Sequence, residues 1–416
     1  MIADRDNALG LYVSIPFCRS KCTYCNFASG VYPAGDHGRY VNRVIENLAA
    51  SREWADQIGV SLPRGVDTVY LGGGTPSLLT PDLLARLFAA MRSEFDLDPD
   101  AEITVECAPG QLAGDTLAEL VAAGVNRVSL GVQSFIDSEA HACGRLHSRA
   151  IVADDLRRLR AAGIVNINVD LIAGLAGQTI ATWQESLDVL AGSGVPHASV
   201  YMLEVDEDSR LGREMLAGGA RYHASLVPSD DVIARMYELA IERLAIAGLA
   251  QYEISNFCRP GFASRHNLRY WQRRPYLGLG LDASSMLRAS FDGTCPAEPQ
   301  YILRSTTADD LAAFIEGAQP PETAWLSSVS QHEEAWFLGL RLNCGVVVAG
   351  LEREFGRAMV APALEVAARL AEAGLLTFAG GRACLTAHGR LLSNDVFQEF
   401  LGLTPHAEFV RPGDVA

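Results

Sequence analysis

Short β-rich runs alternate with longer amphipathic stretches through the first half of this chain, and this alternation limits the folds open to it. Six runs are typical of buried strands, at 11–16, 67–72, 102–107, 127–134, 166–174 and 197–205. Helical patterns lie between them, at 38–56, 81–95, 112–123, 149–162 and 180–192. A strand, a helix and a second strand form a right-handed unit with parallel strands. The sequence therefore predicts an α/β fold, a partial (β/α)6 barrel that falls short of the eight units of a closed one.

The pattern changes after about residue 300. Helical stretches at 308–317, 330–342 and 361–374 lead to a predicted small hairpin at 374–386 and a last helix at about 387–401. This order indicates a mainly helical, winged-helix-like domain. We divide the chain into a barrel, a linking segment, a helical domain and a tail, at 1–250, 251–300, 301–402 and 403–416.

The composition excludes several classes of function. A net charge of −16 argues against a nucleic-acid binder. No stretch approaches the roughly 20 apolar residues of a membrane helix, and the polar start MIADRDNALG lacks the apolar run of a secretory signal. Nine cysteines scattered over 416 residues do not indicate a disulfide framework. We therefore expect a cytoplasmic protein without a membrane span.

Three cysteines, Cys18, Cys22 and Cys25, differ from the rest because they lie together directly after the first predicted strand. Three thiolates on one tight loop can each hold one iron of a [4Fe–4S] cluster, which leaves the fourth iron without a protein ligand. The amino and carboxylate groups of S-adenosylmethionine (SAM) can chelate such an open iron. The alternative is a structural zinc ion, which needs a fourth ligand, and His37 is the nearest histidine.

The cysteine spacing, with Tyr24 before the third cysteine, resembles the hallmark of the radical-SAM superfamily. More narrowly, the chain is similar to the group that contains oxygen-independent coproporphyrinogen III dehydrogenase (HemN) and the related haem chaperone (HemW). The similarity runs from about residue 11 to 290 and more loosely to 402. It implies a radical-SAM barrel with a HemN-type C-terminal domain.

This resemblance assigns further residues to SAM. The glycine run at 71–77 ends the second strand and lets the backbone approach a ligand closely. Polar side chains also stand where later strands end, at the mouth of the barrel. The positions that match the family's SAM contacts are Tyr12, Tyr24, Gly73, Gly74, Thr75, Glu106, Gln133, Arg145 and Asp170.

A second motif, His266-Asn267-x-x-Tyr270-Trp271, lies in the linking segment and is called the HNxxYW motif below. A neutral imidazole is a good axial ligand for haem iron, and aromatic rings can cover a porphyrin face. Taken alone, the pattern also suits a packed, hydrogen-bonded loop. The resemblance implies haem binding, with Cys258 as an alternative ligand.

These residues lead to three hypotheses. The first is a haem chaperone that passes haem to apo-haemoproteins such as membrane respiratory enzymes. The second is a coproporphyrinogen III dehydrogenase, and the third is a radical-SAM enzyme on an unrelated substrate. The dehydrogenases carry a further cysteine where this chain has Phe27, and a long arm where only 17 residues precede Cys18. Both differences favour the chaperone.

Overall fold

A large twisted sheet forms the body of the molecule in the computed structural model, which describes residues 8–290 and 301–404. The strands run in the order β13-β12-β11-β10-β1-β3-β4-β5-β6-β7-β9-β8, and β2 pairs with β11. Those expected from the sequence are β1 (Leu9–Ile15), β3 (Gly65–Gly73), β4 (Asp96–Cys107), β5 (Arg127–Gln133), β6 (Asn166–Ala173) and β7 (His197–Met202). These six are parallel neighbours, as predicted.

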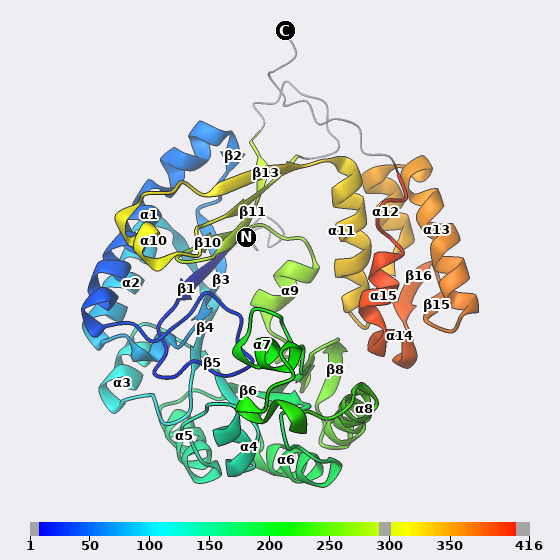
Figure 1. Cartoon of the computed structure of the whole chain (residues 1–416). Coiled ribbons are helices and arrows are strands. Elements are labelled where there is room, and N and C mark those ends of the chain that lie inside the picture. The colour runs from blue at the N-terminus through cyan, green and yellow to red at the C-terminus, as the bar shows by residue number, and fades with distance from the viewer. Residues whose placement is uncertain (1–7, 291–300, 405–416) are drawn as a thin grey trace.

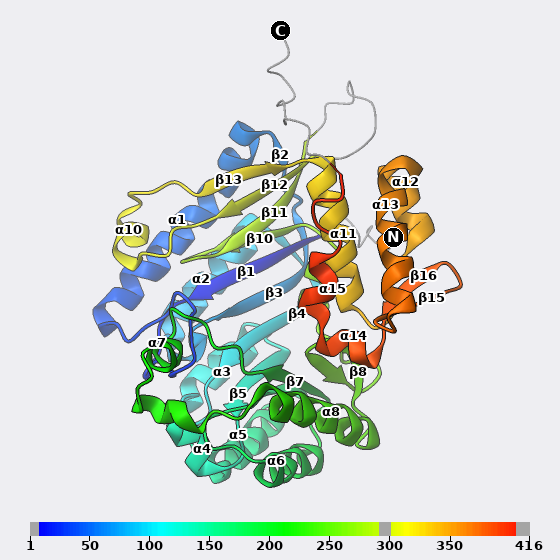
Figure 2. The same cartoon turned by 45° about the vertical axis from the view of Figure 1, so that its right-hand side comes forward.

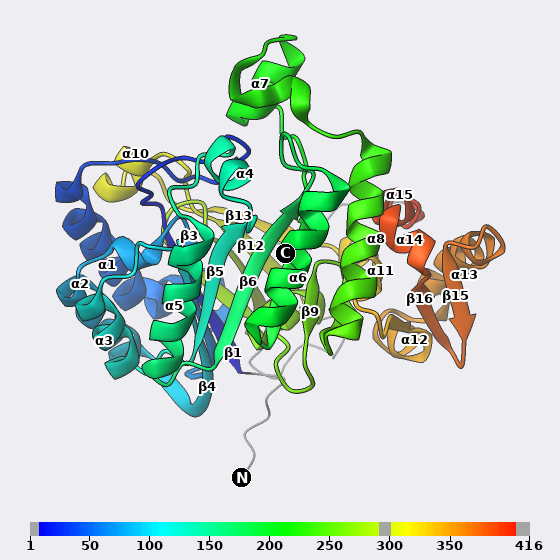
Figure 3. The same ribbon diagram turned by 90° about the horizontal axis from the view of Figure 1, so that it is seen from below.

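Helices cover the outer face of the parallel strands (Figures 1 and 3). They are α1 (Ala34–Ile58), α2 (Pro81–Glu94), α3 (Gly114–Ala122), α4 (Asp137–Ala142), α5 (Arg149–Ala161), α6 (Ile180–Ser193) and α8 (Asp230–Ile246). On β5, Val128, Leu130 and Val132 belong to the main apolar core, while Ser129 hydrogen bonds to Asp170 inside the barrel. The alternation of the strands thus gives the barrel an apolar outside and a polar interior.

The segment at 251–287, which looked irregular in the sequence, is ordered into strands and one helix. Its elements are β8 (Ala250–Glu253), β9 (Asn256–Cys258), α9 (Arg265–Trp271), β10 (Tyr276–Leu279) and β11 (Ser284–Ala289). With β2 (Val60–Ser61), β12 (Ile302–Thr306) and β13 (Glu322–Leu326) they extend the sheet at both edges (Figure 2). Runs of two to six residues are too short to show a clear periodicity in the sequence.

The C-terminal part has a core of its own. Its helices are α11 (Ser328–Arg341), α12 (Val348–Phe355), α13 (Arg357–Glu372), α14 (Ala387–Leu391) and α15 (Ser393–Gln398). A small sheet of β14 (Val346–Val347), β15 (Leu376–Ala379) and β16 (Arg382–Leu385) confirms the predicted hairpin. Trp336 stacks on Phe400 at 4.8 Å in the centre of this core. The helices and hairpin form the winged-helix-like module that the sequence predicted.

The two cores do not divide at residue 300. The main core includes Leu303, Leu311 and Phe314, and α10 (Leu311–Glu316) packs against α1. The second core takes in Ile254 and otherwise runs from Ala335 to Phe400. The predicted tail lies mostly outside the described residues. Among the residues that the structure describes, no helix is both long and apolar enough to cross a membrane.

Candidate functional site

The loop after β1 brings the three clustered cysteines to one pocket at the carboxyl ends of the strands. Cys18 is fixed by a hydrogen bond of 2.8 Å from its backbone N–H to the carbonyl oxygen of Gly30. Cys22 is buried, while Cys18 and Cys25 are partly exposed, and all three line the same pocket. Burial raises the pKa of the Cys18 thiol, and the hydroxyls of Thr75 and Ser29 act in the opposite direction.

The zinc alternative needs four ligands around one ion. Among the described residues, no group of three or more His, Cys, Asp or Glu side chains is placed to hold a single metal ion. His37 is not among the residues that line the pocket of the cysteines, and its ring stacks on Phe17 at 3.9 Å. Thiolates that each bind a separate iron need not converge on one point.

The segment that follows β7 covers the cluster loop. Leu211, on α7 (Arg210–Leu216), donates a backbone hydrogen bond of 2.8 Å to the carbonyl oxygen of Thr23. Asn26 donates a hydrogen bond of 2.8 Å to Asp206, and Tyr24 packs beside Leu203 and Leu211. Figure 3 shows α7 standing out from the body at this end of the barrel, with η2 (Arg221–Leu226) after it.

Glycines after β3 form a second wall of the pocket. Gly73 has a positive φ of 95°, which suits glycine. A Cβ atom on Gly74 would lie 2.8 Å from the carbonyl oxygens of Ile15 and Phe17, so a side chain there would collide with the backbone before the cysteine loop. Thr75 is buried next to them, and its hydroxyl lies 3.9 Å from the sulfur of Cys18. The glycines let this turn approach the cluster loop closely.

Polar groups without protein partners face the same pocket. Oε1 of Gln133 and Nε of Arg145 are buried and have no hydrogen-bond partner among the described residues. Gln133 also adopts a positive φ of 70°, which is unfavourable for a side chain of its type. Both residues line the pocket together with the three cysteines, Gly73 and Gly74. A small polar ligand beside the cysteines would satisfy these atoms, as a SAM molecule bound to an iron–sulfur cluster would.

Glu106, at the end of β4, is the acidic group of this pocket. Burial raises its pKa from 4.5 to about 7. Asp170 contributes to this rise, whereas the Tyr70 hydroxyl, the Gly73 backbone N–H and Arg145 limit it. Tyr70 donates a hydrogen bond of 2.7 Å to Oε1 of Glu106. The carboxyl group is therefore poised to take up or lose a proton near neutral pH.

The remaining predicted SAM residues lie around this pocket. The hydroxyl of Tyr12 would be 3.5 Å from a Cβ atom on Gly73, just below the glycine turn. Asp170 lines an adjoining cleft of about 940 Å³ that also contains Tyr24, Glu106 and Gln133. The other wall of this cleft comes from the C-terminal part, through Arg341 and residues 391–395. The fold thus brings all the predicted SAM positions to one end of the barrel.

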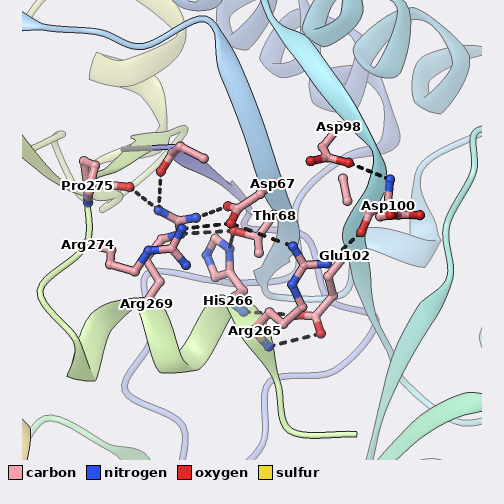
Figure 4. A network of polar contacts seen from close by, with 12 residues as sticks. Asp67, Thr68, Asp98, Asp100, Glu102, Arg265, His266, Arg269, Arg274 and Pro275 are labelled. Carbon is pink, nitrogen blue, oxygen red and sulfur yellow. Dashed lines mark hydrogen bonds and ion pairs between the residues drawn. The ribbon is translucent and has the colours of Figure 1, made fainter. Parts of the chain in front are cut away.

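The HNxxYW motif lies at the opposite, amino end of the strands (Figure 4). It occupies α9, whose first residues donate backbone hydrogen bonds to the carboxylate of Glu102 on β4, at 3.1 Å from Arg265 and 3.0 Å from His266. Ser264 caps the helix by accepting a hydrogen bond from the backbone N–H of Asn267. Arg269 is fully buried and forms an ion pair with Asp67 on β3.

His266 itself is buried, with only 1% of its surface exposed. Its Nδ1 lies 2.9 Å from the hydroxyl of Thr68, and its Nε2 lies 2.9 Å from the hydroxyl of Tyr270. Burial and the neighbouring arginines lower its pKa to about 3, so the ring is neutral. In this conformation neither ring nitrogen is free for iron.

The other residues of the motif are more accessible. Asn267, Tyr270 and Trp271 are all partly exposed. The guanidinium of Arg341 lies over the Trp271 ring at 4.2 Å, and Nε1 of Trp271 has no hydrogen-bond partner among the described residues. Cys258, the alternative ligand, is buried on β9, where it pairs with His197.

Sequence reasoning missed two residues of this region, Tyr70 and Arg341. Tyr70 lies two positions after Thr68 on β3, so the alternation of the strand places both on the inner face. That signal was present in the sequence. Nothing in the sequence placed Arg341, on α11, beside both Trp271 and the cleft, because that contact joins distant segments.

Known families match both parts of the chain. The model of the radical SAM superfamily matches residues 12–190, and that of the HemN C-terminal domain matches residues 326–392. The solved structure of coproporphyrinogen III oxidase (HemN) from Escherichia coli aligns with a TM-score of 0.78 and 22% identity, over 97% of this chain and 92% of that one. The fold and the cysteine loop thus define a radical-SAM protein.

Relatives that match over nearly the full length identify the family within the radical-SAM superfamily. The heme chaperone HemW of Mycobacterium tuberculosis is 35% identical over 94% of this chain and 95% of its own length. The heme chaperone HemW of Lactococcus lactis is 33% identical over 94% and 96%. The chain belongs to this HemW family of radical-SAM proteins.

Proposed function

We propose that this chain is a cytoplasmic haem chaperone that binds haem and passes it to apo-haemoproteins, membrane respiratory enzymes among them. The observation that carries the proposal is the complete HNxxYW motif in a chain of the HemW family. In this proposal the barrel at 1–250 holds the cluster and SAM, the segment at 251–300 binds haem, and the domain at 301–402 closes the cleft.

In this proposal, different residues of the pocket bind the cluster and SAM. Cys18, Cys22 and Cys25 would hold the [4Fe–4S] cluster, and the glycine turn with Thr75 would bind SAM through its backbone. The polar contacts would come from Tyr12, Tyr24, Glu106, Gln133, Arg145 and Asp170. When bound, the cluster and SAM supply one-electron chemistry at the sulfonium centre. The orphaned atoms of Gln133 and Arg145 support this assignment.

Haem would bind at the HNxxYW motif, with His266 as the axial ligand. In the described conformation Nε2 of His266 is hydrogen-bonded to the hydroxyl of Tyr270. Binding of this nitrogen to the haem iron therefore requires that hydrogen bond to break and α9 to move away from the barrel. Tyr270 and Trp271, which are already partly exposed, would then contact the porphyrin face. Asn267 lies beside His266 on the same helix.

Haem titration of the reconstituted full chain tests this proposal. His266→Ala should change the Soret spectrum, and Trp271→Ala should weaken haem binding roughly tenfold to hundredfold with a smaller spectral change. His388→Ala, an exposed histidine on α14, serves as the matched control and should change neither. An unchanged spectrum and affinity in His266→Ala would remove this histidine as the ligand and leave Cys258 as the next candidate.

One observation favours a second candidate, the radical decarboxylation of coproporphyrinogen III. The cleft of about 940 Å³ opens beside Glu106 and Gln133 and is large enough for a tetrapyrrole. However, Phe27 stands where the dehydrogenases carry a cysteine, and its side chain is exposed beside the cluster loop. A radical-SAM enzyme on an unrelated substrate would use the same cleft without any role for the HNxxYW motif.

A further inference from the structure

The SAM pocket and α9 are supported by the same two strands. At its amino end β3 binds α9 through Asp67 and Thr68, and at its carboxyl end it leads into Gly73 of the pocket. Near its middle β4 caps α9 with Glu102, and near its end it carries Glu106. The helix α9 is therefore in direct contact with both strands that end at the SAM pocket.

Tyr70 lies between the two sites and contacts both. Its hydroxyl donates to Oε1 of Glu106 at 2.7 Å. Its ring lies 5.3 Å from the His266 ring, centroid to centroid, with 31° between the two planes. Thr68, on the same face of β3, holds Nδ1 of His266 at 2.9 Å. One tyrosine thus joins a proposed SAM ligand to the proposed haem ligand.

Iron coordination by His266 is incompatible with the docked helix. The neutral ring has one free lone pair, and both of its nitrogens lie in hydrogen bonds while 1% of the residue surface is exposed. Haem ligation must therefore withdraw His266 from the barrel. That withdrawal removes the aromatic partner from one face of Tyr70 and loosens the side chain that fixes Glu106.

We propose that Tyr70 makes SAM binding and haem binding antagonistic in this chain. The proposal rests on haem ligation by His266, as proposed above. SAM favours the docked helix, because it uses Glu106 in the position that Tyr70 holds. Haem favours the undocked helix, and by linkage each ligand weakens the affinity of the other by the same factor. SAM binding then weakens the hold on haem, which gives the chaperone a signal for delivery.

The test uses the full chain with its cluster reconstituted and oxidised, so that no electron is available to cleave SAM. Haem affinity is measured with and without saturating SAM, and SAM affinity with and without haem. We expect each ligand to weaken the other at least about fivefold, and by equal factors. Without haem, SAM should also slow hydrogen exchange of the amides at 265–271.

Two tyrosine variants separate the proposed route from a general effect. Tyr70→Phe keeps the ring and removes the hydroxyl, so the coupling factor should fall toward one while both ligands still bind. Tyr276→Phe is the matched control, because its ring packs on Tyr270 at 4.7 Å but its hydroxyl bonds to Arg304, not to Glu106. Tyr276→Phe should keep the full coupling factor.

The outcomes distinguish this proposal from the proposed function. Independent binding of SAM and haem, in a chain whose Soret band depends on His266, would overturn the antagonism and leave the haem site intact. Full coupling in Tyr70→Phe would overturn Tyr70 as the route. A haem spectrum that is unchanged in His266→Ala would overturn the haem site, and the antagonism with it.

Discussion

Arg269 and Asp67 form an ion pair in the protein interior that joins α9 to β3. Asp67 also accepts a hydrogen bond of 2.9 Å from Arg274 and lies 3.8 Å from the guanidinium of Arg265. Asp67→Asn should therefore lower the free energy of unfolding by about 3–5 kcal/mol, because it leaves buried guanidinium charge without its counter-charge. Denaturant titration of the apoprotein measures this change.

Glu185→Gln provides the control for that prediction, because it breaks a solvent-exposed pair with Arg149. The expected loss there is less than about 1 kcal/mol. Equal losses of unfolding free energy in the two variants would contradict the prediction that the buried Asp67 pair stabilises the fold more than the exposed pair.

The cluster ligands can be tested by EPR spectroscopy. Replacement of Cys18, Cys22 or Cys25 by Ala should abolish the signal of the reduced cluster and its perturbation by SAM, because each thiolate holds a separate iron. Cys107→Ala should keep both, since Cys107 is buried in the main core. Loss of the signal in Cys107→Ala but not in Cys22→Ala would refute the ligand assignment.

The raised pKa of Glu106 leads to a prediction of how SAM affinity depends on pH. Burial raises its pKa to about 7, so the carboxyl group is protonated in weakly acidic solution and ionised above neutrality. SAM carries a cationic sulfonium and an amino group, and the ionised carboxylate should bind it more tightly. Affinity should rise about tenfold between pH 6 and pH 8 in isothermal titration.

Glu106→Gln should bind SAM weakly at both pH values and lose most of this dependence. The groups that face Glu106 are Tyr70, Asp170 and Arg145, and burial also raises the pKa of Asp170. A steep pH dependence that survives in Glu106→Gln would assign the titration to Asp170 instead.

We also expect no conversion of coproporphyrinogen III to protoporphyrinogen IX. The side chain at position 27 is a phenylalanine, 64% exposed beside the cluster loop, where the dehydrogenases carry a cysteine. Product analysis of the reconstituted chain with SAM and a reductant checks this. Sustained product formation would favour the dehydrogenase over the chaperone.

Local sequence patterns determined the barrel and the cluster loop. The six parallel strands fall where alternation and apolar runs placed them, because each contains a continuous run of buried residues. The clustering of Cys18, Cys22 and Cys25 identified a site because all three ligands lie on one short loop. The C-terminal hairpin was also visible, since its glycines mark the turn between β15 and β16.

Only the tertiary structure decided what surrounds the HNxxYW motif. The sequence shows His266 beside two aromatic residues, which suits a haem ligand and a buried helix equally well. The fold places that helix against the amino end of β3 and the middle of β4, where Asp67, Thr68 and Glu102 hold it. These partners are more than 150 residues away in the chain, and such contacts leave no local pattern in the sequence. The link from His266 through Tyr70 to Glu106 has the same origin, because it arises when distant strands close around one polar interior.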